Sequence, residues 1–335
     1  MIYPTITPFT KELDDTFRSS KIINLTDHMP QVPTIHICVG NQKIYKKNTI
    51  INLFENAGID YKSKIFVSDS YFLFDDFEKF VVDDKKSKFI EFAENFKKYL
   101  PIWEITENYS ISKNLTFMSN KVRPHRIICA TVLANLFNID KLNYTYENID
   151  QYSIVNSELL IDTDYDFDVN KTLPDRWVVH SAEHESPYGF SGKRYKNNHE
   201  VFADCLYKSI YHTSATSLIT EPNFYEHGCM FTEKTLMSIY SGHFMIWAGG
   251  WKSAETAKRI GIDIFDDVID HGYQYIEHPG ARVVEAILKN LDFLKNVHLQ
   301  QDLRNLNILR LKRNLELVRN LELLPENIRS LSCVK

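Results

Sequence analysis

A run of six residues, 243–248, constrains the fold of this chain more than any other feature. The run, HFMIWA, has the length of a β-strand, is largely apolar on both faces, and ends at Gly249 and Gly250. A strand that is apolar on both faces is typical of a parallel sheet covered by helices. Two glycines at its carboxyl end allow the backbone to approach a ligand closely. We therefore predict an α/β fold with a ligand-binding edge after this strand.

The residues before this strand predict a short helix. Thr232 is suited to the N-cap position, Glu233 and Lys234 fall in the first turn, and Ser241-Gly242 ends the helix. A helix N-terminus binds anions through its free N–H groups, which makes this turn a candidate phosphate site. The helix dipole also favours a glutamate here without any ligand, so a structural role for Glu233 stays open.

Strands and helices alternate through both halves of the chain, which is the α/β pattern. The predicted strands are residues 34–39, 64–68, 115–118, 177–181 and 217–220, and the predicted helices are residues 47–57, 89–100, 126–137, 200–211 and 281–293. The leucine-rich tail, residues 299–332, lacks a leucine-rich-repeat period and is predicted to be an amphipathic terminal helix.

A second motif lies between the strand at 115–118 and the helix that follows it. Arg123, Pro124, His125 and Arg126 form an RPHR segment, with the proline suited to the first helical position. A positively charged arginine is unfavourable at a helix N-terminus, because the helix dipole is positive there. The presence of two arginines here therefore favours binding of a phosphate or an acceptor over simple solvation. Solvation of the helix start remains the alternative.

The two motifs together resemble the donor-binding half of GT-B glycosyltransferases. The quoted features are TEKT at 232–235, the helix and apolar strand after it, the glycine turn, the RIGID segment at 259–263, and RPHR upstream. The similarity is to the fucosyltransferase-like branch and to phage-encoded relatives. It implies two Rossmann-like domains facing a cleft, with a C-terminal helical extension. We place the junction in the acidic stretch 140–175. This predicts an acceptor-side domain at 1–150, a nucleotide-sugar domain at 151–298, and helices at 299–335 that pack back on the first domain.

The resemblance implies a UDP- or GDP-linked sugar as a substrate, with no cofactor and no bound metal. Glu233 would bind the ribose hydroxyls and Lys234 the diphosphate, while Trp251 would stack on the base unless this turn is purely structural. The predicted donor-binding residues are Arg123, Arg126, Thr232, Glu233, Lys234, Gly249, Gly250 and Arg282. Further candidates for the same crevice are Tyr211, Thr213, Ser217 and Glu221.

The predicted catalytic residues are His125 and Asp69, the latter at the end of a predicted strand. Glu104 and Glu107 are alternatives for the general base that an inverting transfer requires. A retaining transfer requires no such base, so the stereochemistry stays open.

Two acceptors are compatible with the resemblance, namely a modified base in phage DNA and a bacterial surface glycan. The net charge of −5 and the pI of about 6.2 give no nucleic-acid signature for the whole chain. A local basic patch from the lysines and arginines of 121–126 and 193–196 would still follow the phosphates of double-stranded DNA.

Two alternatives to this function follow from other features. Asp162, Asp164, Asp166 and Asp168 alternate as in the DxD metal site of GT-A transferases, although a solvated face explains the same alternation. The other alternative is a non-catalytic binding protein of the same fold. No P-loop, GxSxG or zinc-deaminase motif is present in the sequence.

Five scattered cysteines without CxxC spacing predict reduced thiols in the cytoplasm, which is the host cytoplasm if the chain is phage-encoded. No apolar run approaches the 18 residues of a membrane span.

Overall fold

The computed structural model describes most of the C-terminal two thirds of the chain. The described residues are 88–100, 103–105, 107, 109–119, 123–146, 165–168, 170–174, 211–222 and 231–320, together with the backbone of six short strands. These six strands are β1 (Thr5–Ile6), β2 (Thr34–Ile37), β3 (Ile65–Ser68), β4 (Tyr71–Phe72), β5 (Lys79–Val82) and β9 (Gly228–Cys229).

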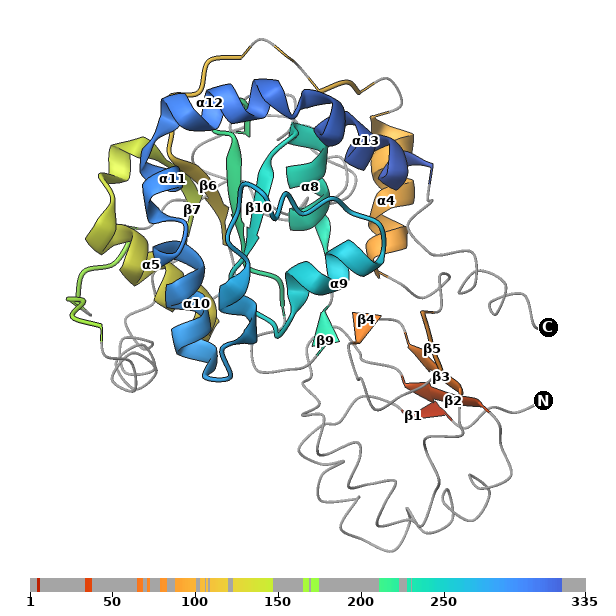
Figure 1. The fold of residues 1–335 in the computed structure, drawn as a ribbon. Helices are drawn as coiled ribbons and strands as arrows, with labels where there is room; N and C mark the ends of the chain where they lie inside the picture. Colours follow the sequence, from red (N-terminus) through yellow and green to blue (C-terminus); the bar gives the residue numbers. More distant parts are fainter. Residues whose placement is uncertain are drawn as a thin grey trace, which may run out of the picture.

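A four-stranded parallel sheet forms the centre of the described fold (Figure 1). Its strands are β6 (Leu115–Met118), β7 (Leu142–Thr145), β8 (Thr216–Ile219) and β10 (Phe244–Trp247), in the order β10-β8-β6-β7. Every residue of these strands is buried, as expected for a parallel sheet with helices on both faces. The α/β class is therefore confirmed, and the 243–248 run supplies an edge strand of this sheet.

Helices cover the sheet in two groups. On one side α5 (Pro124–Leu136) packs against α10 (Pro279–Leu288), and on the other α8 (Glu233–Ser241) packs against α4 (Lys88–Tyr99) and α13 (Ile308–Arg319). The chain passes from β6 through α5 to β7 in one direction and from β8 through α8 to β10 in the other. Right-handed crossovers in opposite directions place α5 and α8 on opposite faces.

The point where these directions diverge lies between β6 and β8, which are hydrogen-bonded neighbours. At such a switch point the two helices leave opposite faces of the sheet, and ligands of open α/β folds bind in the crevice at the carboxyl ends of the strands. The loops that enter α5 and α8 both begin at this edge.

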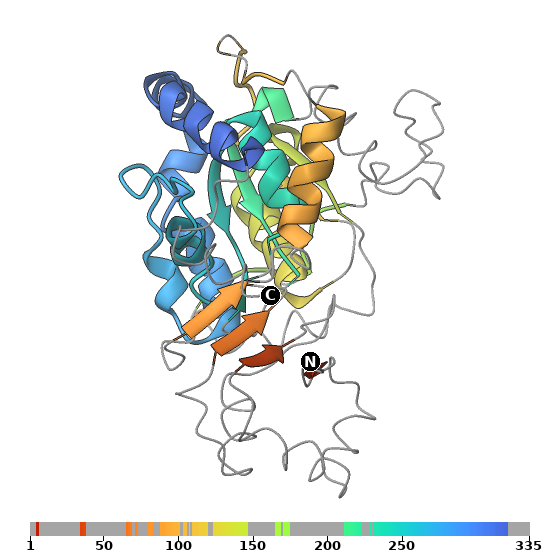
Figure 2. The same cartoon turned by 90° about the vertical axis from the view of Figure 1, so that its right-hand side faces the viewer.

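A second parallel sheet, in the order β1-β2-β3-β5, comes from the first 82 residues, and Figure 2 shows its strands as orange and red arrows. The predicted strands at 34–39 and 64–68 belong to this sheet, and the strand at 243–248 belongs to the central one. The predicted strand at 177–181, the predicted helix at 47–57 and all but the last residue of the predicted helix at 200–211 lie outside the described residues. That last residue, Tyr211, begins the 3-10 helix η5 (Tyr211–Thr213). The antiparallel pair of β4 and β9 connects residues 71–72 with residues 228–229.

The strand pairing differs from the predicted grouping of residues along the chain. We expected residues 115–145 to belong with the N-terminal strands, but β6 and β7 are paired with β8 and β10. Sequence proximity favoured the first grouping, whereas β6 pairs with β7 over all four of its residues and with β8 at Thr116 and Phe117. The arrangement as two Rossmann-like domains, and the boundaries at 150 and 298, stay predictions.

The predicted start and end of α8 are confirmed. Thr232 is the N-cap, its hydroxyl accepting a hydrogen bond from the Lys234 amide, and Gly242 ends the helix with φ 64°. A Cβ at Gly242 would lie 2.6 Å from the Cγ2 atom of Ile105, so both the backbone angle and the packing require glycine here.

The C-terminal part is divided into shorter helices than the sequence predicted. The predicted helix 281–293 is two helices, α10 and α11 (Leu291–Lys295), and the tail forms α12 (Val297–Leu306) and α13. Asn290 lies between α10 and α11, and its side chain bonds both the amide and the carbonyl of Asp270. Within the described ranges, no helix has the length and apolarity needed to cross a membrane.

Candidate functional site

The RPHR segment bonds the backbone that leaves β8. Arg126 Nη2 donates to the Thr220 carbonyl at 3.0 Å, His125 Nε2 to the Glu221 carbonyl at 2.8 Å, and Arg123 Nη1 to the Pro222 carbonyl at 2.8 Å. Three successive carbonyls thus accept from three side chains at the start of α5. We call these contacts the carbonyl latch. They join the two loops at the switch point.

Burial sets the charge of the latch residues. His125 and Arg126 are 0% and 3% exposed. Burial, followed by the neighbouring charges of Arg126 and Arg123, lowers the pKa of His125 well below its ordinary value, so the imidazole is neutral. Because a carbonyl only accepts, the Nε2 atom of this neutral ring carries the proton. Burial also lowers the pKa of Arg126 to about 10, which leaves the guanidinium charged at neutral pH.

The carboxylate of Glu221 lies against the first turn of α8. It accepts the Thr232 N–H at 2.9 Å, the Thr232 hydroxyl at 2.5 Å and the Thr235 hydroxyl at 2.6 Å. The residue is 4% exposed, and burial raises the pKa of this carboxyl, while the Lys234 charge and the threonine hydroxyls oppose the rise. Part of the anion-binding capacity of this helix start is therefore used by a carboxylate of the protein itself.

Glu233 and Lys234 form an ion pair in the same turn. Glu233 Oε1 lies 2.6 Å from Lys234 Nζ, and the two side chains are 18% and 16% exposed. Burial by itself would raise the pKa of Glu233, but the Lys234 ammonium and the hydrogen bonds around the carboxylate outweigh it and lower the pKa to about 2. These two side chains retain access to solvent at the edge where His125 and Arg126 are buried.

The Thr220 hydroxyl lies at the same edge. Its Oγ1 atom is buried and has no hydrogen-bond partner within the described part of the chain. A buried hydroxyl without a partner is costly, at ~1–3 kcal/mol. Among the described residues, the switch point thus combines two helix starts, three cationic side chains and a buried hydroxyl that has no hydrogen-bond partner there.

The predicted glycine turn contacts the predicted arginine. Arg282 Nε donates to the Gly249 carbonyl at 2.8 Å, and its Nη1 donates to the Ile276 carbonyl at 2.8 Å. The guanidinium carbon lies 5.6 Å from the centre of the Trp251 ring. Arg282 is 2% exposed, so it joins the turn after β10 to the start of α10. The glycine turn follows β10, and the carbonyls of the latch follow the neighbouring strand β8. A contact also joins β10 to α8, because Trp247 Nε1 donates to the Thr235 hydroxyl at 3.2 Å.

Several other predicted residues lie elsewhere. Tyr211 and Thr213 precede β8, so they lie at the amino end of the sheet, opposite the predicted crevice. Ser217 is also directed away from that edge, because its hydroxyl bonds His243 Nδ1 at 2.8 Å just before β10. Of the alternatives for a general base, Glu107 is exposed and pairs with Lys312 of α13. Glu104 is exposed, and Asp69 lies outside the described residues.

The acidic run is described only in part. Asp162 and Asp164 lie outside the described residues, whereas Asp166 and Asp168 are exposed and alternate with Tyr165 and Phe167. The two aromatic rings stack at 5.9 Å and pack against the core, and the Tyr165 hydroxyl donates to Glu285. The described half of the run therefore has exposed carboxylates and packed aromatic rings, as a solvated face predicts. The described residues contain no group of three His, Cys, Asp or Glu side chains that would hold a metal ion.

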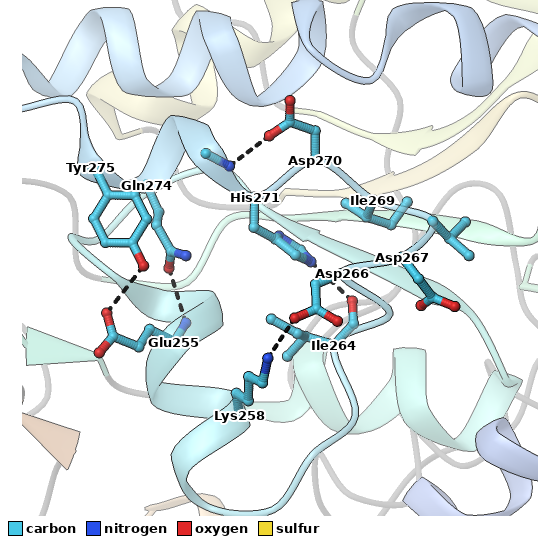
Figure 3. A pocket seen from close by; sticks show the side chains of 12 residues that line it. Glu255, Lys258, Ile264, Asp266, Asp267, Ile269, Asp270, His271, Gln274 and Tyr275 are labelled. Carbon is cyan, nitrogen blue, oxygen red and sulfur yellow. Dashed lines mark hydrogen bonds and ion pairs between the residues drawn. The ribbon is translucent and has the colours of Figure 1, made fainter.

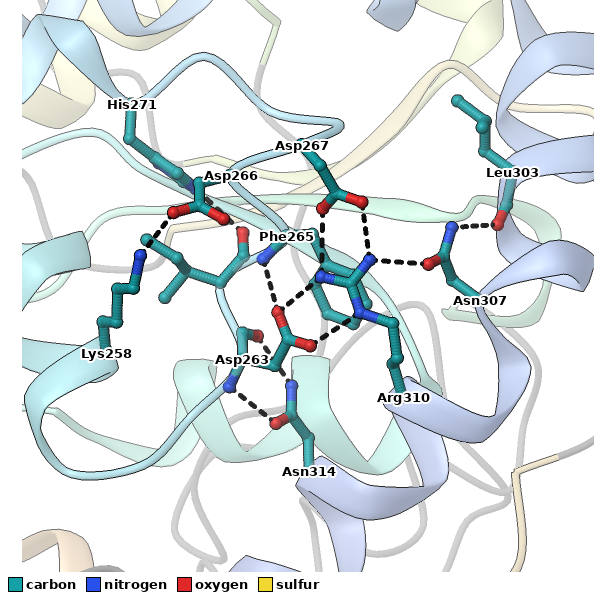
Figure 4. A network of polar contacts seen from close by, with 11 residues as sticks. Lys258, Asp263, Phe265, Asp266, Asp267, His271, Leu303, Asn307, Arg310 and Asn314 are labelled. Carbon is teal, nitrogen blue, oxygen red and sulfur yellow. Dashed lines mark hydrogen bonds and ion pairs between the residues drawn. The ribbon is translucent and has the colours of Figure 1, made fainter.

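A hollow of about 560 Å³ lies between α9 (Ser253–Arg259) and residues 264–275, and no predicted site residue lines it (Figure 3). Three of its carboxylates have cationic partners, since Asp266 pairs with Lys258 at 2.5 Å, Asp267 with Arg310 at 2.8 Å and Glu255 with Arg259 at 2.6 Å. The fourth, Asp270, accepts the Gly272 N–H at 2.7 Å. Figure 4 shows Arg310 of α13 between Asp267 and Asp263. Sequence reasoning did not single out this acidic segment, and the structure gives it the role of joining α9 and α13.

No family model, curated protein or solved structure matches the chain.

Proposed function

We propose that the protein is a glycosyltransferase that binds a UDP- or GDP-linked sugar at the switch point between β6 and β8. The observation that carries the proposal is the meeting of the α5 and α8 N-termini at one edge, where Arg123, Arg126 and Lys234 bring positive charge. A departing nucleoside diphosphate requires such charge and oriented N–H groups. The partly exposed Glu233 is placed beside them, and its ionised carboxylate suits the ribose hydroxyls.

In this proposal the bond between the anomeric carbon and the donor phosphate oxygen breaks as an acceptor oxygen bonds to that carbon. The acceptor proton passes to a base, and the diphosphate leaves with the bonding electrons. Asp69 of the N-terminal region is the proposed base, within a second Rossmann-like domain across a cleft. The buried His125 supports the edge through the Glu221 carbonyl, and it would contact a substrate only if the latch opened.

A thermal-shift screen against UDP-, GDP-, CMP- and dTDP-sugars tests the donor. A ligand at ~100 times its Kd stabilises a protein by about 2.7 kcal/mol, which gives a measurable rise in Tm. We expect one of the four nucleotides to stabilise the wild type. Lys234→Met should lose at least about tenfold in affinity, the size of one charged hydrogen bond. Lys258→Met is the matched control, because it removes a lysine on α9 outside the proposed site. No shift with any donor, or equal losses in the two variants, would contradict the proposal.

The identity of the acceptor and the requirement for a metal ion are tested on the same protein preparation. Transfer to duplex DNA should weaken steeply with salt, because binding releases counterions from the phosphates. Transfer to a surface glycan should not show this dependence. Activity that survives EDTA would exclude the metal-dependent alternative at Asp162 and Asp164.

A second candidate is a binding protein of the same fold that carries out no transfer. The observation in its favour is the carbonyl latch, because the side chains of the RPHR motif already bond protein backbone. Donor binding without transfer or hydrolysis, over a panel of acceptors, would establish this alternative.

A further inference from the structure

Glu221 contacts both helices that begin at the switch point. Its carbonyl accepts from His125 of α5 at 2.8 Å, and its carboxylate accepts from Thr232 and Thr235 of α8 at 2.5–2.9 Å. The residue is separated from the end of β8 only by Thr220 and is 4% exposed. One side chain therefore joins the sheet edge to the first turn of α8, while its backbone is bonded to α5.

The position of these contacts matters for the proposed donor site. Thr232 and Thr235 flank Glu233 and Lys234 in the chain, so Glu221 holds the turn on both sides of the ion pair. Hydrogen bonds to a carboxylate are stronger than those between neutral groups, and a negative charge at a helix N-terminus is favourable. The three carboxylate contacts given above all go to the protein, and the carboxylate is buried. Glu221 is thus placed to act on a ligand through α8.

We infer that Glu221 is a positioning residue, which holds the first turn of α8 on the sheet edge and thereby places Glu233 and Lys234 for the donor. The inference rests on the proposed function for its ligand, but its effect on the turn is independent of any ligand. Displacing a binding group by about 1 Å is enough to cost up to ~100-fold in activity.

The test compares Glu221→Gln with Thr216→Val. The glutamine keeps the shape of the side chain and removes the charge. Thr216 is at the other end of the same strand, is fully buried, and donates its hydroxyl to Gln300 at 2.9 Å. Thr216→Val therefore removes a buried hydrogen bond of β8 without touching the switch point, and controls for a general loss of stability.

Two measurements are made on each protein. Without ligand, hydrogen exchange at amides 233–236 should be about tenfold or more faster in Glu221→Gln than in Thr216→Val, as expected for local opening of one helical turn. With UDP and GDP as probes, calorimetry should show about tenfold to hundredfold weaker binding in Glu221→Gln and little change in the control. Thr235→Val should weaken binding by the same route, so the double variant should lose less than the product of the two single effects.

The outcomes separate the two proposals. If the wild type binds neither UDP nor GDP, the donor assignment fails, and the exchange data alone decide whether Glu221 holds the turn. If exchange at 233–236 is the same in Glu221→Gln and Thr216→Val, the positioning role is overturned. It is also overturned if the wild type binds a diphosphate and Glu221→Gln binds it equally well.

Discussion

Replacement of Glu233 by glutamine should destabilise the protein at neutral pH but not in acid. The carboxylate lies 2.6 Å from Lys234 Nζ with 18% of its side chain exposed, and its pKa is lowered from 4.5 to about 2. At ~1.4 kcal/mol per pKa unit, this lowering corresponds to at most about 3.5 kcal/mol. Solvent contact on both side chains reduces the effect, so we expect a loss of about 1–2 kcal/mol, between the values of exposed and buried pairs.

The pH dependence follows from the sign of this shift. Because the native pKa lies below the unfolded value of 4.5, the contribution is complete above about pH 5.5 and decreases as the pH falls toward about 2. Urea unfolding of wild type and Glu233→Gln, followed by tryptophan fluorescence at pH 7, 5, 4 and 3, measures the difference. We expect it to shrink steadily below pH 4.5. A difference that stays constant from pH 7 to pH 3 would refute the reasoning.

The control is the same change in a Lys234→Met background. Without the ammonium, Glu233 loses the partner that lowers its pKa, so Glu233→Gln should cost much less or even stabilise the protein. An equal cost in both backgrounds would show that the ion pair contributes little to stability, and the charge at the helix N-terminus alone would then explain the result.

Two further predictions concern the Tyr273 hydroxyl and the Arg310 guanidinium. Tyr273→Phe should cost about 1–3 kcal/mol, because the hydroxyl accepts the Trp247 N–H of the edge strand at 3.0 Å and its loss leaves a buried donor unpaired. Tyr275→Phe, on a residue that is 53% exposed, is the matched control and should change the unfolding free energy by less than about 0.5 kcal/mol. Arg310→Met should lower the stability by about 1–2 kcal/mol at low salt, and by less in 1 M salt, because its two aspartate pairs are partly exposed and are screened. A salt-independent loss in thermal unfolding would indicate that lost packing, and not charge, is responsible.

The local elements of this protein were predictable from the sequence. The apolar run before Gly249 determined that β10 is a strand buried on both faces, and Thr232 and Gly242 determined where α8 begins and ends. The physical reason is that strand periodicity, an N-capping hydroxyl and a left-handed glycine act within a few residues of the chain. For the same reason, the sequence placed RPHR correctly at the start of α5.

The partners of these elements were decided only by the tertiary structure. His125 and Glu221 are 96 positions apart, and nothing local indicates that the histidine bonds the backbone after β8. The pairing of β6 with β8 is equally non-local, which is why residues 115–145 were expected with the N-terminal strands. Long-range pairing depends on which buried surfaces and hydrogen-bonding edges fit together once the chain is compact. The sequence therefore determined the helix starts and strand ends, whereas the tertiary structure decided that RPHR, Glu221 and the first turn of α8 meet at one edge.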